Sequence, residues 1–179
     1  MSKGVLPVFK ASFFLNQKRE DGLRLRVVYA GDHVYTDFQL SDRFQSETNL
    51  LYDGIFFGIM DVLMWYAILM KTKKICMTKK ITVEFLEPLR CDAPYRAKSK
   101  LMDVKGKDYY VAAWTEDGKG KVYTRVDALF REGKDISIAD IFRDFDFSET
   151  TPEMKEFFES FLKKGKADTI KQVKNERQA

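Results

Sequence analysis

The alternation of hydrophobic and polar positions predicts strands on both sides of one long apolar segment. Residues 23–29 and 34–40 alternate around a turn at Gly31-Asp32, a pattern typical of a β-hairpin. Further strands are predicted at residues 77–87, 95–104, 108–116 and 121–130. Short glycine-containing turns separate the last three, so we expect an antiparallel meander with one buried and one solvent-facing surface.

The segment from Gly54 to Met70 is apolar on every side except for one charged residue, Asp61. A helix of this kind is either buried in protein or spans a membrane. A span needs about 20 apolar residues and disfavours an Asp near its centre, and Lys71 closes this shorter segment. We therefore expect a central helix covered by the sheet, which is an α+β fold.

Composition shifts near both ends of the chain. We expect an N-terminal segment at 1–19, a sheet-and-helix domain at 20–132 and a C-terminal helical extension at 133–179. In the extension, Phe, Ile and Met recur at helical spacing over 136–147 and 152–162, and Pro152 suits a first helical turn. Residues 163–179 are rich in Lys, Gln and Asn and are expected to fray.

The residue inventory restricts the chemistry. The chain of 179 residues has one histidine, His33, and two cysteines, Cys76 and Cys91. These cannot form a Cys/His zinc site unaided or a disulfide-rich secreted scaffold, and we expect no cofactor. Any Ser-His-Asp or Cys-His catalyst would depend on His33. Carboxylates, backbone amides and water are the groups left for catalysis.

The first sixteen residues have no clean apolar stretch followed by a cleavage site, and Lys3 and Lys10 interrupt them. We therefore predict no signal peptide and expect a cytoplasmic protein with both thiols reduced. A disulfide between Cys76 and Cys91 is the less favoured alternative.

The positive charge of the chain is concentrated in residues 71–107, which hold eleven basic and four acidic side chains. This excess indicates either a solvated strand face or a surface for a phosphorylated ligand. Nucleic acid is disfavoured as a partner, because the pI of 8.9 is modest and no nucleic-acid-binding motif occurs.

Two features of the apolar segment suit catalysis. A carboxylate in apolar surroundings is costly unless it is hydrogen-bonded or functional, so Asp61 is either a general base or a buried structural residue. The free amides of the helix start, Tyr52-Asp53-Gly54, carry partial positive charge and can polarise a carbonyl. Asp53 is also a plausible N-cap, and its side chain would then occupy those amides.

These residues resemble a pattern of the PaaI-like branch of the hotdog-fold thioesterase superfamily. In that branch a His-Gly-Gly motif opens the central helix and an Asp follows on it. Tyr52-Asp53-Gly54 and Asp61 stand at the matching positions, and Val62 stands where many relatives carry Glu. Three strand segments are also similar to those of the family: residues 22–26, 81–88 and 118–130.

The resemblance implies a hotdog fold and an acyl-CoA thioesterase that acts as a homodimer or homotetramer, with a site completed by the partner subunit. It implies Asp61 as base or nucleophile, and the amide of Asp53 or Gly54 as the donor to the thioester carbonyl. Further residues expected at the substrate are Tyr52, Gly58, Trp65, Lys98 and Lys100, the two lysines near the phosphates of CoA.

The main alternative is a non-catalytic hotdog domain that binds an acyl or aromatic ligand or serves as an assembly module. It is motivated by Tyr52-Asp53, which replaces the His-Gly of the motif. A dehydratase of the same fold is a more distant alternative, because its usual Asp/His pair would require His33.

Overall fold

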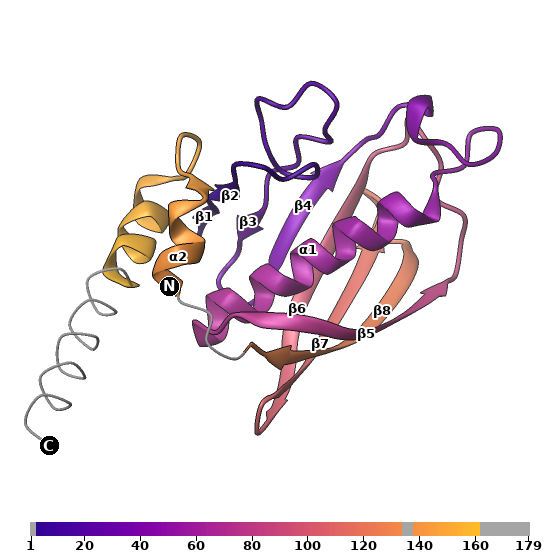
Figure 1. The fold of residues 1–179 in the computed structure, drawn as a ribbon. Helices are drawn as coiled ribbons and strands as arrows, with labels where there is room; N and C mark the ends of the chain where they lie inside the picture. Colours follow the sequence, from indigo (N-terminus) through magenta and orange to yellow (C-terminus); the bar gives the residue numbers. More distant parts are fainter. Residues whose placement is uncertain (1–2, 134–137, 162–179) are drawn as a thin grey trace, which may run out of the picture.

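A single long helix on the inner face of a large sheet dominates the molecule (Figure 1). The computed structural model describes residues 3–133 and 138–161. The helix is α1 (Asp53–Thr72), and the sheet has seven strands in the order β1-β3-β4-β6-β7-β8-β5, with every neighbouring pair antiparallel. The predicted α+β architecture, a sheet around a central helix, is confirmed.

The strands of the sheet differ in how regularly buried and exposed side chains alternate along them. They are β1 (Gly4–Val5), β3 (Val28–Tyr29), β4 (Val34–Phe38), β5 (Cys76–Phe85), β6 (Tyr95–Lys105), β7 (Asp108–Glu116) and β8 (Val122–Glu132). In β7 every second residue from Tyr109 to Thr115 is buried. Ten residues of α1 are buried with them, which makes the helix the centre of the hydrophobic core.

α1 also has the length and composition of a membrane-spanning helix. Its most hydrophobic window is 56% buried inside the protein, and it packs closely on β6 and β7. More than half of this apolar window is therefore buried within the fold, as expected of a central helix.

The expected simple meander is wrong for its first strand. β6, β7 and β8 follow one another, but β5 pairs with β8 and forms one edge of the sheet. Connection length explains the difference. Two residues join β6 to β7 and five join β7 to β8, whereas residues 86–94 separate β5 from β6. Only that longer connection can carry the chain across the end of the sheet.

The predicted first hairpin is shorter than expected. Of residues 23–29 only Val28 and Tyr29 form strand β3, and Arg24 has a left-handed backbone (φ 54°) that interrupts the predicted extended segment. Residues 25 and 27 instead form backbone hydrogen bonds with the N-terminal segment. Leu25 N donates to Phe14 O and Leu6 N donates to Val27 O, both at 2.9 Å. A 3-10 turn, η1 (Asp42–Phe44), lies between β4 and α1.

The N-terminal segment packs on the C-terminal extension. The expected helix over 136–147 is too long: α2 (Ile138–Arg143) stops at a turn, and β9 (Phe145–Asp146) then pairs with β2 (Val8–Phe9). A helix at 152–161 begins at Pro152 as expected. Because β1 joins the sheet and β2 pairs with β9, the described part of the N-terminal segment links the main sheet to the C-terminal extension. The tail at 163–179 lies outside the described residues.

Candidate functional site

Asp61 lies on the part of α1 that the sheet leaves uncovered. Phe56, Met60 and Leu63 on the same helix are buried, whereas Asp61 is only half-buried. The expectation of a helix that is buried all round is therefore wrong at this position. A sheet covers one side of a helix, and the opposite side stays open unless another segment packs on it. Asp61 is thus a carboxylate that a ligand can reach.

The carboxylate of Asp61 is held by a side chain from the neighbouring edge strand. Thr78 Oγ1 on β5 donates a hydrogen bond to Asp61 Oδ1 at 2.5 Å. A hydrogen bond to a carboxylate is short and stronger than one between neutral groups. It fixes the orientation of one carboxylate oxygen and leaves the other available.

Thr78 was missed by the sequence reasoning for a geometric reason. In a regular strand the inward residues Ile81 and Val83 would leave Thr78 on the outer face. The register of β5 against β8 shifts between Thr78 and Lys80, so one extra residue is inserted there. A β-bulge of this kind re-aims the side chains that precede it. Alternation alone gives no signal for that shift.

The start of α1 offers free backbone donors. Tyr52 is the N-cap residue and Asp53 the first helical residue, and no side chain caps the helix. The alternative interpretation, in which Asp53 caps the amides, is therefore wrong. The amides of Asp53 and Gly54 belong to the first turn, where N–H groups have no acceptor inside the helix. The Tyr52 ring folds over Gly54: a Cβ on that glycine would lie 2.5 Å from the ring.

One chain does not bring these amides to Asp61. Eight residues separate Asp53 from Asp61 along α1, which corresponds to about 12 Å at the helical rise. A single thioester carbonyl is too small to contact both. Within one chain, Asp61 and the helix start therefore do not meet at one carbonyl.

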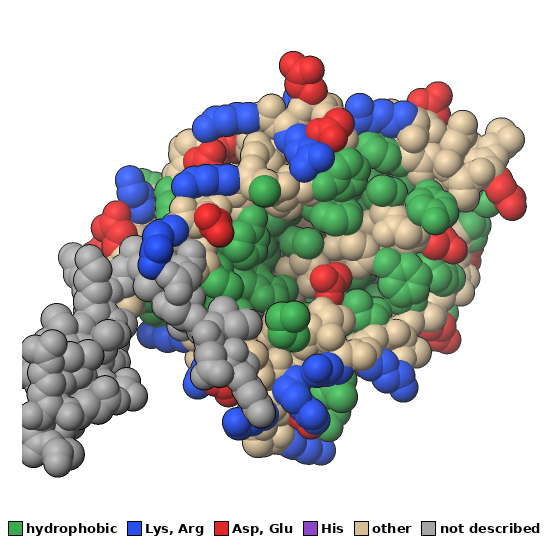
Figure 2. All heavy atoms as spheres, viewed as in Figure 1, with side chains coloured by type: hydrophobic (Ala, Val, Ile, Leu, Met, Phe, Trp, Pro, Cys, Tyr) green, Lys and Arg blue, Asp and Glu red, His purple; other side chains and the backbone are tan. Residues whose placement is uncertain are grey.

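Aromatic side chains border the open part of α1. Phe14 packs directly on Gly58, so that a Cβ there would overlap the Phe14 ring. Trp65 contacts Phe9, with ring centroids 5.4 Å apart. On the side of β5, the ring of the partly exposed Phe57 lies 6.5 Å from that of Phe85. Figure 2 shows hydrophobic side chains around a hollow on this face.

Lys98 and Lys100 are on the other side of the sheet. Their neighbours Ala97 and Ser99 are fully buried towards α1, so the two lysines alternate to the outer face. Lys98 Nζ forms an ion pair with Glu116 at 2.5 Å. Within one chain the structure therefore separates both lysines from Asp61.

The histidine and the cysteines take no part in this arrangement. His33 Nδ1 lies 2.7 Å from Asp32 in the β3–β4 turn. Cys76 and Cys91 are buried free thiols, and burial raises the pKa of Cys76 to about 12. Among residues 3–133 and 138–161, no cluster of His, Cys, Asp and Glu could hold a metal ion.

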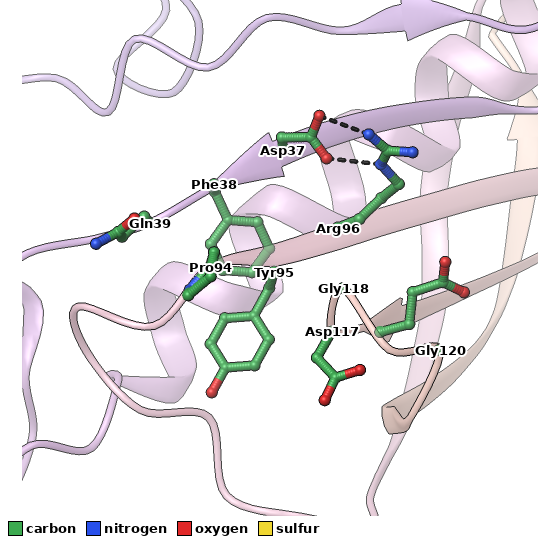
Figure 3. Close-up of a pocket in the computed structure, with 10 residues that line it drawn as sticks. Asp37, Phe38, Gln39, Pro94, Tyr95, Arg96, Asp117, Gly118 and Gly120 are labelled. Carbon is green, nitrogen blue, oxygen red and sulfur yellow. Dashed lines mark hydrogen bonds and ion pairs between the residues drawn. The ribbon is translucent and has the colours of Figure 1, made fainter.

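A pocket of about 610 Å³ lies between the ends of β4 and β6 and the β7–β8 turn (Figure 3). Asp37 and Arg96 form a double hydrogen bond on its wall, at 2.6 and 2.8 Å. Glu116 and Asp117 add two more carboxylates. The pocket contains none of the predicted site residues, and its excess of acidic groups disfavours the phosphates of CoA.

Comparison with known proteins identifies the fold. No protein-family model and no curated protein matches the sequence. Among solved structures, a thioesterase superfamily protein superimposes with a TM-score of 0.63 at 17% identity; the match covers 69% of this chain and 61% of that protein. This chain has a hotdog fold. Further similar structures support the same fold.

One is a Streptococcus mutans protein bound to acetyl CoA, with a TM-score of 0.56, 10% identity, and coverage of 61% of this chain and 88% of that one. Another is a phenylacetic acid degradation-related protein from Ralstonia eutropha JMP134. It superimposes with a TM-score of 0.54 at 16% identity, and the match covers 61% of this chain and 85% of that protein.

Proposed function

We propose that this hotdog protein hydrolyses acyl-CoA thioesters, with Asp61 as the general base or nucleophile. The observation that carries the proposal is the hydrogen bond from Thr78 to a solvent-accessible Asp61 on the central helix. A carboxylate held in one orientation can activate a water molecule or attack a thioester carbonyl directly. The acetyl CoA bound by the Streptococcus mutans protein of similar fold supports a CoA thioester as the substrate.

The carbonyl donor in this proposal comes from a second subunit. The first-turn amide of Asp53 or Gly54 polarises the thioester oxygen and stabilises the negative charge that develops on it. Because about 12 Å separates Asp53 from Asp61 in one chain, the donor belongs to the partner subunit of a homodimer. A two-fold axis would then create two identical sites, each built from both chains.

The edge strand β5 is the surface proposed for this pairing. Its free edge exposes backbone donors and acceptors, which favour association with another strand. Met77 and Phe85 on β5 are 56% and 43% exposed, and Leu86 just beyond it is 39% exposed. Pairing of β5 across a two-fold axis would bury these side chains and bring the two α1 helices side by side.

The direct test measures thiol release from a panel of acyl-CoAs. Asp61→Asn removes the base but keeps the size of the side chain, and we expect kcat to fall by about 10²- to 10⁴-fold. Asp127→Asn is the matched control, because Asp127 is exposed on β8 on the outer face of the sheet. Equal rates for wild type and Asp61→Asn would overturn the proposal.

A non-catalytic, ligand-binding hotdog domain is the second candidate. It is favoured by the Asp53 carboxylate, which stands next to the proposed donor amide and opposes negative charge there. Calorimetry that detects binding of acyl-CoAs without turnover across the same panel would support this candidate. Turnover that depends on Asp61 would exclude it.

A further inference from the structure

The open part of α1 ends at Trp65, one helical turn beyond Asp61. The Trp65 ring is packed by aromatic residues from both ends of the chain: Phe9 at 5.4 Å and Phe145 at 6.4 Å between ring centroids. Phe9 and Phe145 are themselves paired across β2 and β9 and lie 4.5 Å apart. Trp65 is therefore held in place by the two-stranded sheet of β2 and β9, which is separate from the main sheet.

The C-terminal extension covers α1 beyond this point. Phe161 and Phe157 pack under the ammonium group of Lys73, which lies 4.6 and 5.8 Å from their ring centroids. In Figure 1 the orange and yellow segments lie against this end of α1. The opposite end is open, because Tyr52, Asp53 and Gly54 are all exposed.

The two ends therefore differ in what they can accept. Towards the start of α1, beyond Phe14 on Gly58, a ligand at Asp61 reaches the exposed first turn, which suits the bulky CoA moiety. Towards the end of α1 it meets Trp65 after four residues, or about 6 Å. Thr78 on β5 borders this stretch at Asp61 itself.

We propose that Trp65 is a specificity-determining residue that limits the acyl group to short chains. This inference rests on the proposed function, because it places the thioester carbonyl at Asp61. An acyl chain longer than the distance to Trp65 must displace the ring. Displacement would disrupt the aromatic contacts with Phe9 and Phe145 as well as the ring's own packing.

The test measures binding rather than turnover. Non-hydrolysable thioether analogues of acetyl-, butanoyl-, octanoyl- and palmitoyl-CoA are titrated by calorimetry into the full chain. For wild type we expect the octanoyl analogue to bind at least about tenfold more weakly than the butanoyl analogue, a difference of one decade in Kd. Trp65→Leu should abolish this preference, and the milder Trp65→Phe should reduce it.

Trp114→Leu is the matched control. Trp114 is half-buried on the outer face of β7, where its Nε1 donates to Glu116, and its loss should leave the length profile unchanged. The inference about Trp65 is overturned if the wild type binds all analogues equally well. It is also overturned if Trp65→Leu and Trp65→Phe leave the dependence of Kd on chain length unaltered. Neither result affects the proposed function. Failure of every analogue to bind overturns the proposed function together with the inference.

Discussion

At the scale of single residues, the proposed chemistry depends on the hydrogen bond between Thr78 and Asp61. The sequence alone singles out Asp61, because an isolated charge in an apolar helix stands out in the pattern. It cannot single out Thr78, because the side chain reaches Asp61 only through the bulge before Lys80. It also leaves the role of Asp53 open, and the helix boundary at Tyr52 decides that question.

Removal of the Thr78 hydroxyl should lower activity without unfolding the protein. We expect Thr78→Val to reduce kcat by about 10- to 100-fold, the equivalent of one hydrogen bond to a charged group. KM should change little, since the substrate does not lose a direct contact. Steady-state thiol release measures both constants. Thr82→Val on the exposed face of the same strand is the control, and an equal loss there would contradict the role of Thr78.

The donor amide can be tested with a pair of variants at Asp53, of which only one lacks the N–H. Asp53→Pro deletes the amide at the first helical position, where proline is well tolerated, and Tyr52 already has the extended backbone that precedes proline (φ −63°, ψ 121°). We expect kcat to fall by about 10²-fold or more. Asp53→Ala keeps the amide and removes the charge, so it should retain or raise the activity. Full activity of Asp53→Pro would show that the Asp53 amide is not the donor to the thioester carbonyl.

At the scale of elements, hydrophobic pattern predicts α1 and the long strands well but misplaces the short ones. The apolar segment and the alternation in β6, β7 and β8 follow from side chains that face the core. The short strands β2 and β9 depend on contacts between the two ends of the chain, which lie more than 130 residues apart. Local pattern contains no information about such pairing, so the helix predicted over 136–147 was extended too far.

The N-terminal segment should stabilise α1 through one buried hydrogen bond. The hydroxyl of Tyr66, which is fully buried, donates to Pro7 O at 2.7 Å. Tyr66→Phe leaves that carbonyl without its donor, and we expect the free energy of unfolding to fall by about 1–3 kcal/mol. Denaturant unfolding followed by circular dichroism measures the change. Tyr110→Phe, at a side chain that is 38% exposed, should have no comparable effect.

At the scale of the whole molecule, the proposed site is complete only in an oligomer. Light scattering should therefore report a homodimer or a multiple of it, with β5 as the proposed contact. Phe85→Glu or Phe85→Lys should weaken the assembly, because a charge would be buried in the interface. A stable monomer that retains full activity would contradict the two-subunit site.

Complementation between two inactive variants tests the central claim most directly. Asp61→Asn lacks the carboxylate and Asp53→Pro lacks the amide, and each alone should be nearly inactive. After the two are unfolded together and refolded at equal amounts, half of the dimers carry one intact site, so about a quarter of the wild-type activity should return. Thiol release that stays at the level of the separate variants would contradict a site made from Asp61 of one subunit and the helix start of the other.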